Sequence, residues 1–153
     1  MTTADVPPTP VDLVALREAL EASWDERTSY LGVREEGNPA LGQCYPTARV
    51  VQHFLPAAEI VKGVVRTRDR DEVHFWVELP TDVGVIAVDL TWQQFPPGSV
   101  VTERRVLDRD GLGDSPPTVA RCDLLLARVR AHLGVRMPAD RRGPQRASGG
   151  ETA

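Results

Sequence analysis

Three side chains of this 153-residue chain are of the types that perform nucleophilic catalysis together: Cys44, His74 and Asp89. Cys44 lies in the run LGQCYPTARVV, at the predicted start of a helix. Unpaired backbone N–H groups and the positive end of the helix dipole favour a thiolate there. A histidine can hold the proton of such a thiol, and a carboxylate can orient the imidazole. These residue types therefore predict acyl transfer through a thioester on Cys44.

The histidine and the aspartate are expected to meet across a β-hairpin. His74 opens the predicted strand VHFWVEL, and Asp89 closes the next one, VIAVDL. A turn at Pro80–Val83 would pair residue 79 with 84 and place His74 directly opposite Asp89, with Cβ atoms about 5 Å apart. A purely structural His–Asp pair is the alternative. The other face of the hairpin is expected to be core and carries Phe75, Val77, Ile86 and Val88.

Other residues have weaker signals. Gln43 precedes the cysteine and could donate to an oxyanion, although an exposed loop glutamine fits the sequence as well. Trp76 shares the predicted face of His74, so it is expected to line a substrate pocket or to fill the core. Cys122 lies among apolar residues of the final helix, which is typical of an inert core thiol. His53 and His132 lie in predicted helices, where they face solvent or lie near the C-terminal carbonyl groups.

A zinc site is the competing interpretation of the three residues, since cysteine, histidine and aspartate are all zinc ligands. The sequence has no CxxC, HxH or HExxH motif, and it lacks the paired cysteines of zinc deaminases. It also has no glycine-rich phosphate loop and no dinucleotide-binding fingerprint. We therefore expect no metal and no other cofactor.

Composition excludes several classes of protein. A mass of 16.8 kDa, with 41% hydrophobic and 26% charged residues, indicates one globular domain. A net charge of −4 argues against a nucleic-acid partner, and the sequence has no apolar run of the roughly 20 residues that a membrane span needs. The segment 1–10 does not resemble a signal peptide, and two cysteines make no disulfide framework, so we expect a cytoplasmic protein. The basic residues are arginines except for Lys62.

Hydrophobic periodicity predicts the elements that must position these residues. A helix is expected from Asp12 to about Thr28, a second from Cys44 to Pro56, and a third over Pro116–Leu133. The apolar side of the third should carry Val119, Leu124, Leu125, Ala127 and Val129. Four strands are expected at Glu59–Arg66, Val73–Leu79, Gly84–Leu90 and Val100–Val106.

This order of elements predicts an α+β fold with an antiparallel sheet. We expect a single domain over residues 11–137, a flexible N-terminus over 1–10 and a disordered tail over 138–153.

The run NPALGQCYPTARVVQHFL, followed by EIVKG, HFWVEL and VDLTWQQF, resembles the bacterial YunG family of small proteins. The resemblance covers about residues 20–96; the family commonly has an asparagine where Val77 stands here. The order of helix cysteine, strand histidine and strand aspartate is also similar to that of papain-like folds, such as transglutaminases and arylamine N-acetyltransferases. This second resemblance implies a papain-like core, with Cys44 as nucleophile, His74 as general base and Asp89 as its orienter.

The sequence thus favours a cysteine-dependent acyl-transfer enzyme acting as an amide or thioester hydrolase, a deamidase or a transferase. Its expected partner is a small amide, a thioester or a peptide, without nucleic acid or membrane. The alternative is a non-enzymatic binding module that retains a papain-like fold. The two differ in whether Cys44 and His74 lie together beside a cleft that is open to water.

Overall fold

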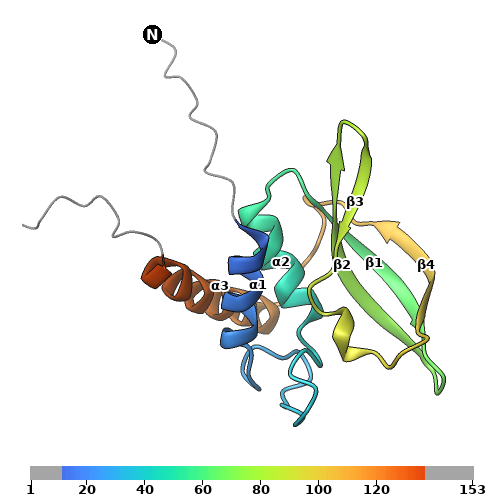
Figure 1. Ribbon diagram of the computed structural model, residues 1–153, viewed down its shortest axis with the longest axis horizontal. Coiled ribbons are helices and arrows are strands. Elements are labelled where there is room, and N and C mark those ends of the chain that lie inside the picture. Colours follow the sequence, from blue (N-terminus) through green and yellow to red (C-terminus); the bar gives the residue numbers. More distant parts are fainter. Residues whose placement is uncertain (1–11, 137–153) are drawn as a thin grey trace, which may run out of the picture.

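The computed structural model describes residues 12–136, which form an α+β arrangement with one antiparallel sheet (Figure 1). This confirms the predicted fold class. The segments 1–10 and 138–153, expected to be flexible, lie outside the described residues. In chain order the elements are α1 (Leu13–Ser23), α2 (Cys44–Phe54), β1 (Glu59–Arg66), β2 (Asp71–Thr81), β3 (Gly84–Val88), the 3-10 helix η1 (Trp92–Gln94), β4 (Val100–Val106) and α3 (Pro116–Arg136).

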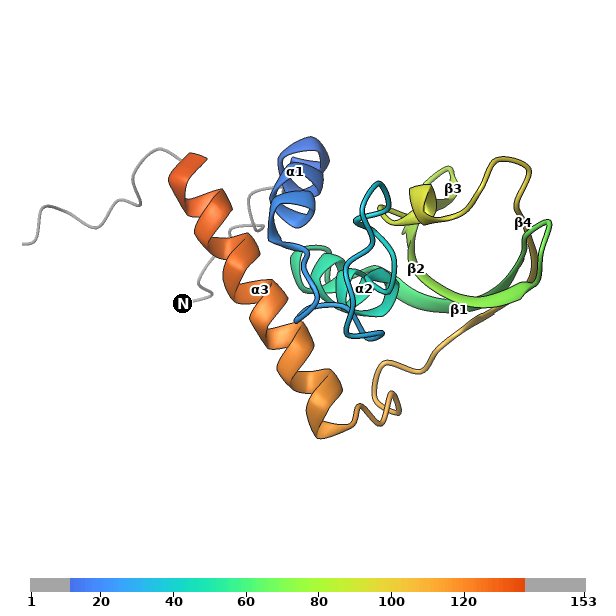
Figure 2. The ribbon, with the colours of Figure 1, turned by 90° about the horizontal axis from the view of Figure 1, so that it is seen from below.

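The helices gather on one side of the molecule and the curved sheet lies on the other (Figure 2). α2 lies between the two layers, where it contacts β1, β2 and α3, while α1 packs against α3. The strand order is β3-β2-β1-β4, and every pairing is antiparallel. The core fills the space between the helices and the sheet, and its members include Leu16, Leu20, Trp24, Val51, Ile60, Val77, Leu125 and Val129.

The sequence explains where the first two helices begin. Asp12 caps α1 by accepting a hydrogen bond of 2.9 Å from the backbone N–H of Val14. In α2 the buried positions Cys44, Thr47, Ala48 and Val51 recur at helical spacing, so the cysteine begins the stripe that faces the core. The predicted helix start at Cys44 is confirmed.

The hairpin of β2 and β3 has a different register from the predicted one. Thr81 pairs with Gly84 and Val77 with Val88, so the loop has two residues and every pair sums to 165 instead of 163. The prediction placed Pro80 in the turn, but β1 pairing ends at Glu78, so a missing N–H at Pro80 costs no hydrogen bond to β1. A shift by two residues keeps each side chain on its predicted face.

Three predicted core positions are wrong. Ile86 is 50% exposed, because β3 is an edge strand whose residues before Val88 project beyond the helices. Val119 and Ala127 are also exposed, since only a narrow side of α3, centred on Leu125 and Val129, packs against α1 and α2.

Gly63 in β1 allows the sheet to hold a large aromatic ring. It pairs with His74 of β2, and the neighbouring ring of Trp76 lies over it. A Cβ atom at Gly63 would clash with Cη2 of the Trp76 ring, and it would lie 2.6 Å from Cζ3 of that ring and 2.6 Å from the carbonyl oxygen of Glu103. The backbone oxygen cannot move without breaking the sheet, so the ring position depends on this glycine.

Gly63→Ala should therefore lower the free energy of unfolding by about 1–3 kcal/mol, the usual cost of overpacking. Urea unfolding measures the loss, and near-UV circular dichroism reports the displaced tryptophan. The matched control is Gly134→Ala in α3, whose new Cβ meets no neighbour and should leave stability unchanged or raise it by about 0.5–1 kcal/mol. Equal stability of the two variants would contradict this account of the Trp76 position.

Candidate active site

His74 and Asp89 lie in direct contact. The imidazole is fully buried, and its Nε2 lies 2.6 Å from Oδ2 of Asp89. The other carboxylate oxygen, Oδ1, accepts hydrogen bonds from the backbone N–H and the hydroxyl of Thr91, at 3.2 and 3.4 Å. Because β3 ends at Val88, Asp89 leaves the ladder and turns its carboxylate toward the histidine. The loop after β3 thus fixes the orientation of the Asp89 carboxylate, and this carboxylate fixes the orientation of the His74 ring.

Aromatic side chains surround the imidazole. Trp76 stacks on it with ring centroids 5.6 Å apart, and Phe95 meets it edge-on at 4.8 Å. Trp92 lies 6.0 Å away and also contacts Phe95. Trp92 and Phe95 were not predicted as site residues, although both belong to the VDLTWQQF motif that carried the family resemblance. This aromatic shield, formed by Trp76, Trp92 and Phe95, excludes solvent from the imidazole of His74.

The electrostatic balance at His74 favours the imidazolium. Burial lowers the pKa of His74, but hydrogen bonding and charge interactions with Asp89 and Cys44 outweigh it and raise this pKa to about 9. The Nδ1 atom is buried and has no well-formed hydrogen bond among the described residues. Because Nε2 is bound to Asp89, Nδ1 is the ring nitrogen that is free to interact with the Cys44 thiol.

Cys44 lies between this buried pair and an open cavity. Its side chain is only 4% exposed, yet it lines a cavity of about 820 Å³ together with Tyr45, Phe75 and the loop before α3. Its helix is held in place by Thr47, whose hydroxyl accepts a hydrogen bond of 3.0 Å from Nε1 of Trp24. The structure thus brings Cys44, His74 and Asp89 together, and Cys44 is one of the residues that line the cavity.

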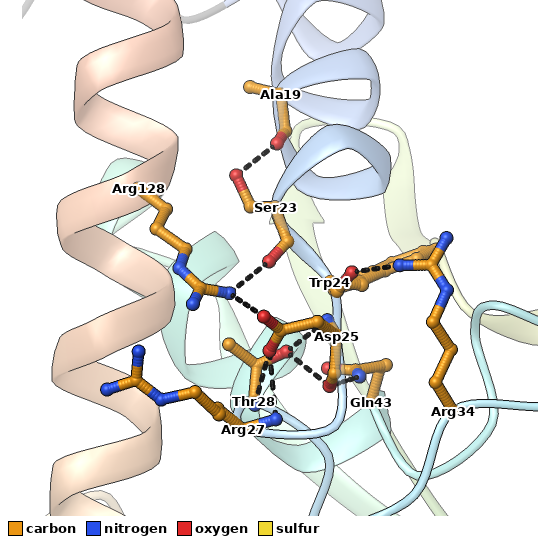
Figure 3. Close-up of polar contacts among 9 residues, drawn as sticks. All are labelled: Ala19, Ser23, Trp24, Asp25, Arg27, Thr28, Arg34, Gln43 and Arg128. Carbon is orange, nitrogen blue, oxygen red and sulfur yellow. Dashed lines mark hydrogen bonds and ion pairs between the residues drawn. The ribbon is translucent and has the colours of Figure 1, made fainter.

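Gln43 lies in a polar network beneath the start of α2 (Figure 3). Its amide nitrogen donates to the backbone oxygen of Asp25 at 2.9 Å, and the carboxylate of Asp25 forms an ion pair of 2.8 Å with Arg128 of α3. The pKa of Asp25 is low because hydrogen bonds, the largest from Arg128, outweigh its burial. The network joins α1, α2 and α3 at the point where Cys44 must be positioned. The alternative of an exposed loop glutamine is wrong, because Gln43 is buried, and its oxyanion contact stays a prediction.

Trp76 is buried and does not border the cavity. Its Nε1 donates to Glu78 at 3.2 Å, and Arg104 of β4 binds the same carboxylate. Of the two predicted roles for Trp76, the described contacts fit the core role, in which the ring supports His74.

Tyr45 is a cavity residue that the sequence analysis missed. Its ring packs edge-on against Phe75 at 4.9 Å, and its hydroxyl donates to Asp114, which also forms an ion pair of 3.1 Å with Arg49. Burial and the neighbouring carboxylate raise the pKa of Tyr45 well above its usual range. The signal in the sequence that could have predicted this role is the position of the tyrosine directly after Cys44.

The remaining thiol and imidazoles have no place in this site. Cys122 is partly buried in α3, and burial raises its pKa to about 11. His53 lies 2.8 Å from the guanidinium of Arg130, and His132 is exposed. Within residues 12–136, no group of three or more histidine, cysteine or acidic side chains is arranged to hold a metal ion. None of the helices in that range has the length and apolar character needed to cross a membrane.

Comparison with known proteins identifies the family. The model of the YunG protein family matches residues 12–134. The chain belongs to the YunG family. Neither the search of curated proteins nor that of solved structures gives a match, so the YunG assignment stands on the family model.

The raised pKa of His74 predicts a pH dependence of stability. A folded pKa of about 9 lies above the unfolded value of about 6.5, so the contribution of the charged ring is fully present below pH 6.5 and is lost as the pH rises to 9. The full contribution is on the order of 3 kcal/mol. Urea unfolding between pH 6 and 10 should show this decline.

Asp89→Asn should flatten the decline of the free energy of unfolding with rising pH, because it removes the group that raises the pKa of His74 most strongly. The control Asp69→Asn makes the same change at an exposed turn and should keep the decline. A slope that is the same in the native protein and in Asp89→Asn would show that Asp89 does not hold the charge on His74.

Proposed function

We propose that this YunG protein is a cysteine-dependent acyl-transfer enzyme with Cys44 as nucleophile, His74 as general base and acid, and Asp89 as orienter. One observation carries the proposal: a buried histidine is bound at Nε2 by a carboxylate, while its Nδ1 is left without a well-formed bond beside a thiol that borders a cavity. A purely structural histidine would be expected to satisfy both ring nitrogens.

In the proposed reaction the thiolate of Cys44 attacks the carbonyl carbon of an amide or thioester. The carbon–sulfur bond forms, and the tetrahedral oxyanion is held by the backbone N–H of Cys44 and by a second donor. Gln43 is the candidate for the second donor, a role that requires its amide to turn away from the carbonyl of Asp25. His74 gives its proton to the leaving amine or thiol as the bond between the carbonyl carbon and this leaving group breaks. Water or an amine then attacks the thioester, and His74 takes up the proton of the attacking group.

The surroundings of the three residues support this mechanism. The aromatic shield keeps water from the imidazole, which strengthens its bond to Asp89 electrostatically. Cys44 at the first position of α2 is close to the positive end of the helix dipole. A helix cysteine facing a strand histidine and an aspartate is also the arrangement of papain-like enzymes, and we propose a papain-like core on that likeness.

The proposal also includes the class of substrate and the cellular compartment of the protein. Hydrolysis, deamidation and transfer to an amine share the thioester step, and the cavity of about 820 Å³ has room for a small amide, a thioester or a peptide end. Cys44 and Cys122 are both free thiols, which fits a reducing compartment, and we place the protein in the cytoplasm.

Selective alkylation tests for an activated thiol. Iodoacetamide at pH 6 should label Cys44 more than about tenfold faster than Cys122, because thiolate content governs the rate and burial keeps Cys122 protonated. Asp89→Asn and His74→Gln should each slow labelling of Cys44, since both weaken the cation beside it. Peptide mass spectrometry of the native protein follows both sites in one sample.

His132→Gln is the matched control, since it makes the same change at an exposed imidazole and should leave both rates unaltered. Slow and equal labelling of the two cysteines, unaffected by His74→Gln, would rule out an activated cysteine. The protein would then be a binding module that uses the cavity without chemistry.

A further inference from the structure

A row of three side chains crosses the sheet on the face that lines the cavity. Arg105 of β4 pairs directly with Lys62 of β1, and Lys62 pairs directly with Phe75 of β2. All three line the cavity that Cys44 borders. The row therefore extends from two cations to an aromatic ring that packs against Tyr45, the residue after the cysteine.

The two cations form an unfavourable pair. Like charges directly opposite each other in a sheet destabilise it. No ion pair within residues 12–136 includes Lys62 or Arg105. Glu103 lies two residues before Arg105 in β4, but it forms no ion pair with either cation. The contact recorded for Lys62 is with the Phe75 ring, 6.0 Å from Nζ to the ring centroid. A cost of this kind is offset when an anion binds between the two charges.

A third cation faces the same space from the opposite layer. Arg121 of α3 lines the cavity, and its Nε is buried without a hydrogen-bond partner among the described residues. Two carboxylates also line the cavity, so its three positive and two negative side chains leave one net positive charge. Asp114 is already neutralised by Arg49, and Asp108 accepts the backbone N–H of Asp110 at 3.0 Å. The cavity is thus positive in a protein whose net charge is −4.

We infer that the cavity binds an acyl donor that carries an anionic group, a carboxylate or a phosphate, held by Lys62 and Arg105. The inference rests on the proposed function and names the substrate class of the same site. The anion would lie against the β1–β4 pair, the connecting part of the substrate would pack on Phe75 and Tyr45, and the carbonyl carbon would reach Cys44.

Matched alkylating probes test this inference. Iodoacetyl-β-alanine carries a carboxylate, its amide is the neutral counterpart, and iodoacetyl phosphoethanolamine carries a phosphate. Both anionic probes should label Cys44 faster than the amide, by about tenfold at low salt, after correction for their rates with a free thiol in solution. The faster of the two identifies the anionic group, and intact mass gives all rates.

Lys62→Gln and Arg105→Gln should each reduce the anionic preference, expressed as the ratio of the anionic to the neutral labelling rate, and together abolish it. Arg68→Gln is the control: it removes the same charge from an exposed turn outside the cavity and should leave the preference intact. No preference, or a preference that survives the double substitution or falls equally in Arg68→Gln, would overturn the inference. Fast labelling by the amide in that case would leave the proposed function standing.

A second measurement does not depend on the thiol. Acetyl-β-alanine titrated into Cys44→Ser should shift the backbone amide signals of Lys62 and Arg105 in a nitrogen–proton correlation spectrum, and its amide should not. This result would support the anion site even if Cys44 proved unreactive. Equal shifts with the neutral amide, or none with the acid, would overturn it.

Discussion

The hydrogen bond between His74 and Asp89 is the interaction on which the site depends. A fully buried imidazole is stable in this position only if a partner compensates for the water it has lost, and Asp89 provides that partner at 2.6 Å. The bond requires β3 to end at Val88 so that Asp89 can leave the ladder. It requires Gly63 as well, because the ring of Trp76 that stacks on His74 occupies the place of a Cβ atom.

The two faces of β2 then separate two tasks. The face of His74 and Trp76 is closed by Trp92 and Phe95, which keeps the imidazole dry. The face of Phe75 borders the cavity, where cations from β1, β4 and α3 meet. Cys44 is the residue that belongs to both environments, since it influences the charge of His74 and also lines the cavity. Cys44 thereby connects the buried imidazole with the cavity.

Much of this arrangement follows from local sequence patterns. The alternation in EIVKGVVR and VVTERRV predicts β1 and β4 with their observed bounds, and the apolar spacing after Cys44 predicts α2. The His–Asp contact was predicted from a register that is wrong by two residues, and it survives because Asp89 leaves the ladder after Val88 and turns its carboxylate toward the histidine. The roles of Gly63, Trp92 and Phe95, and the facing of Lys62 and Arg105, depend on pairing between distant segments, which no local periodicity contains.

The most direct test of the central claim is to trap the thioester. Native protein mixed with p-nitrophenyl acetate at pH 7 and quenched in acid should gain one acetyl mass on Cys44, and hydroxylamine should remove it. Cys44→Ser should lose this rapid adduct, and Cys122→Ser, the matched control, should keep it. If Cys44→Ser gains the same mass at the same rate, or if the native protein gains none, Cys44 is not an acyl-accepting nucleophile and the account of this site is wrong.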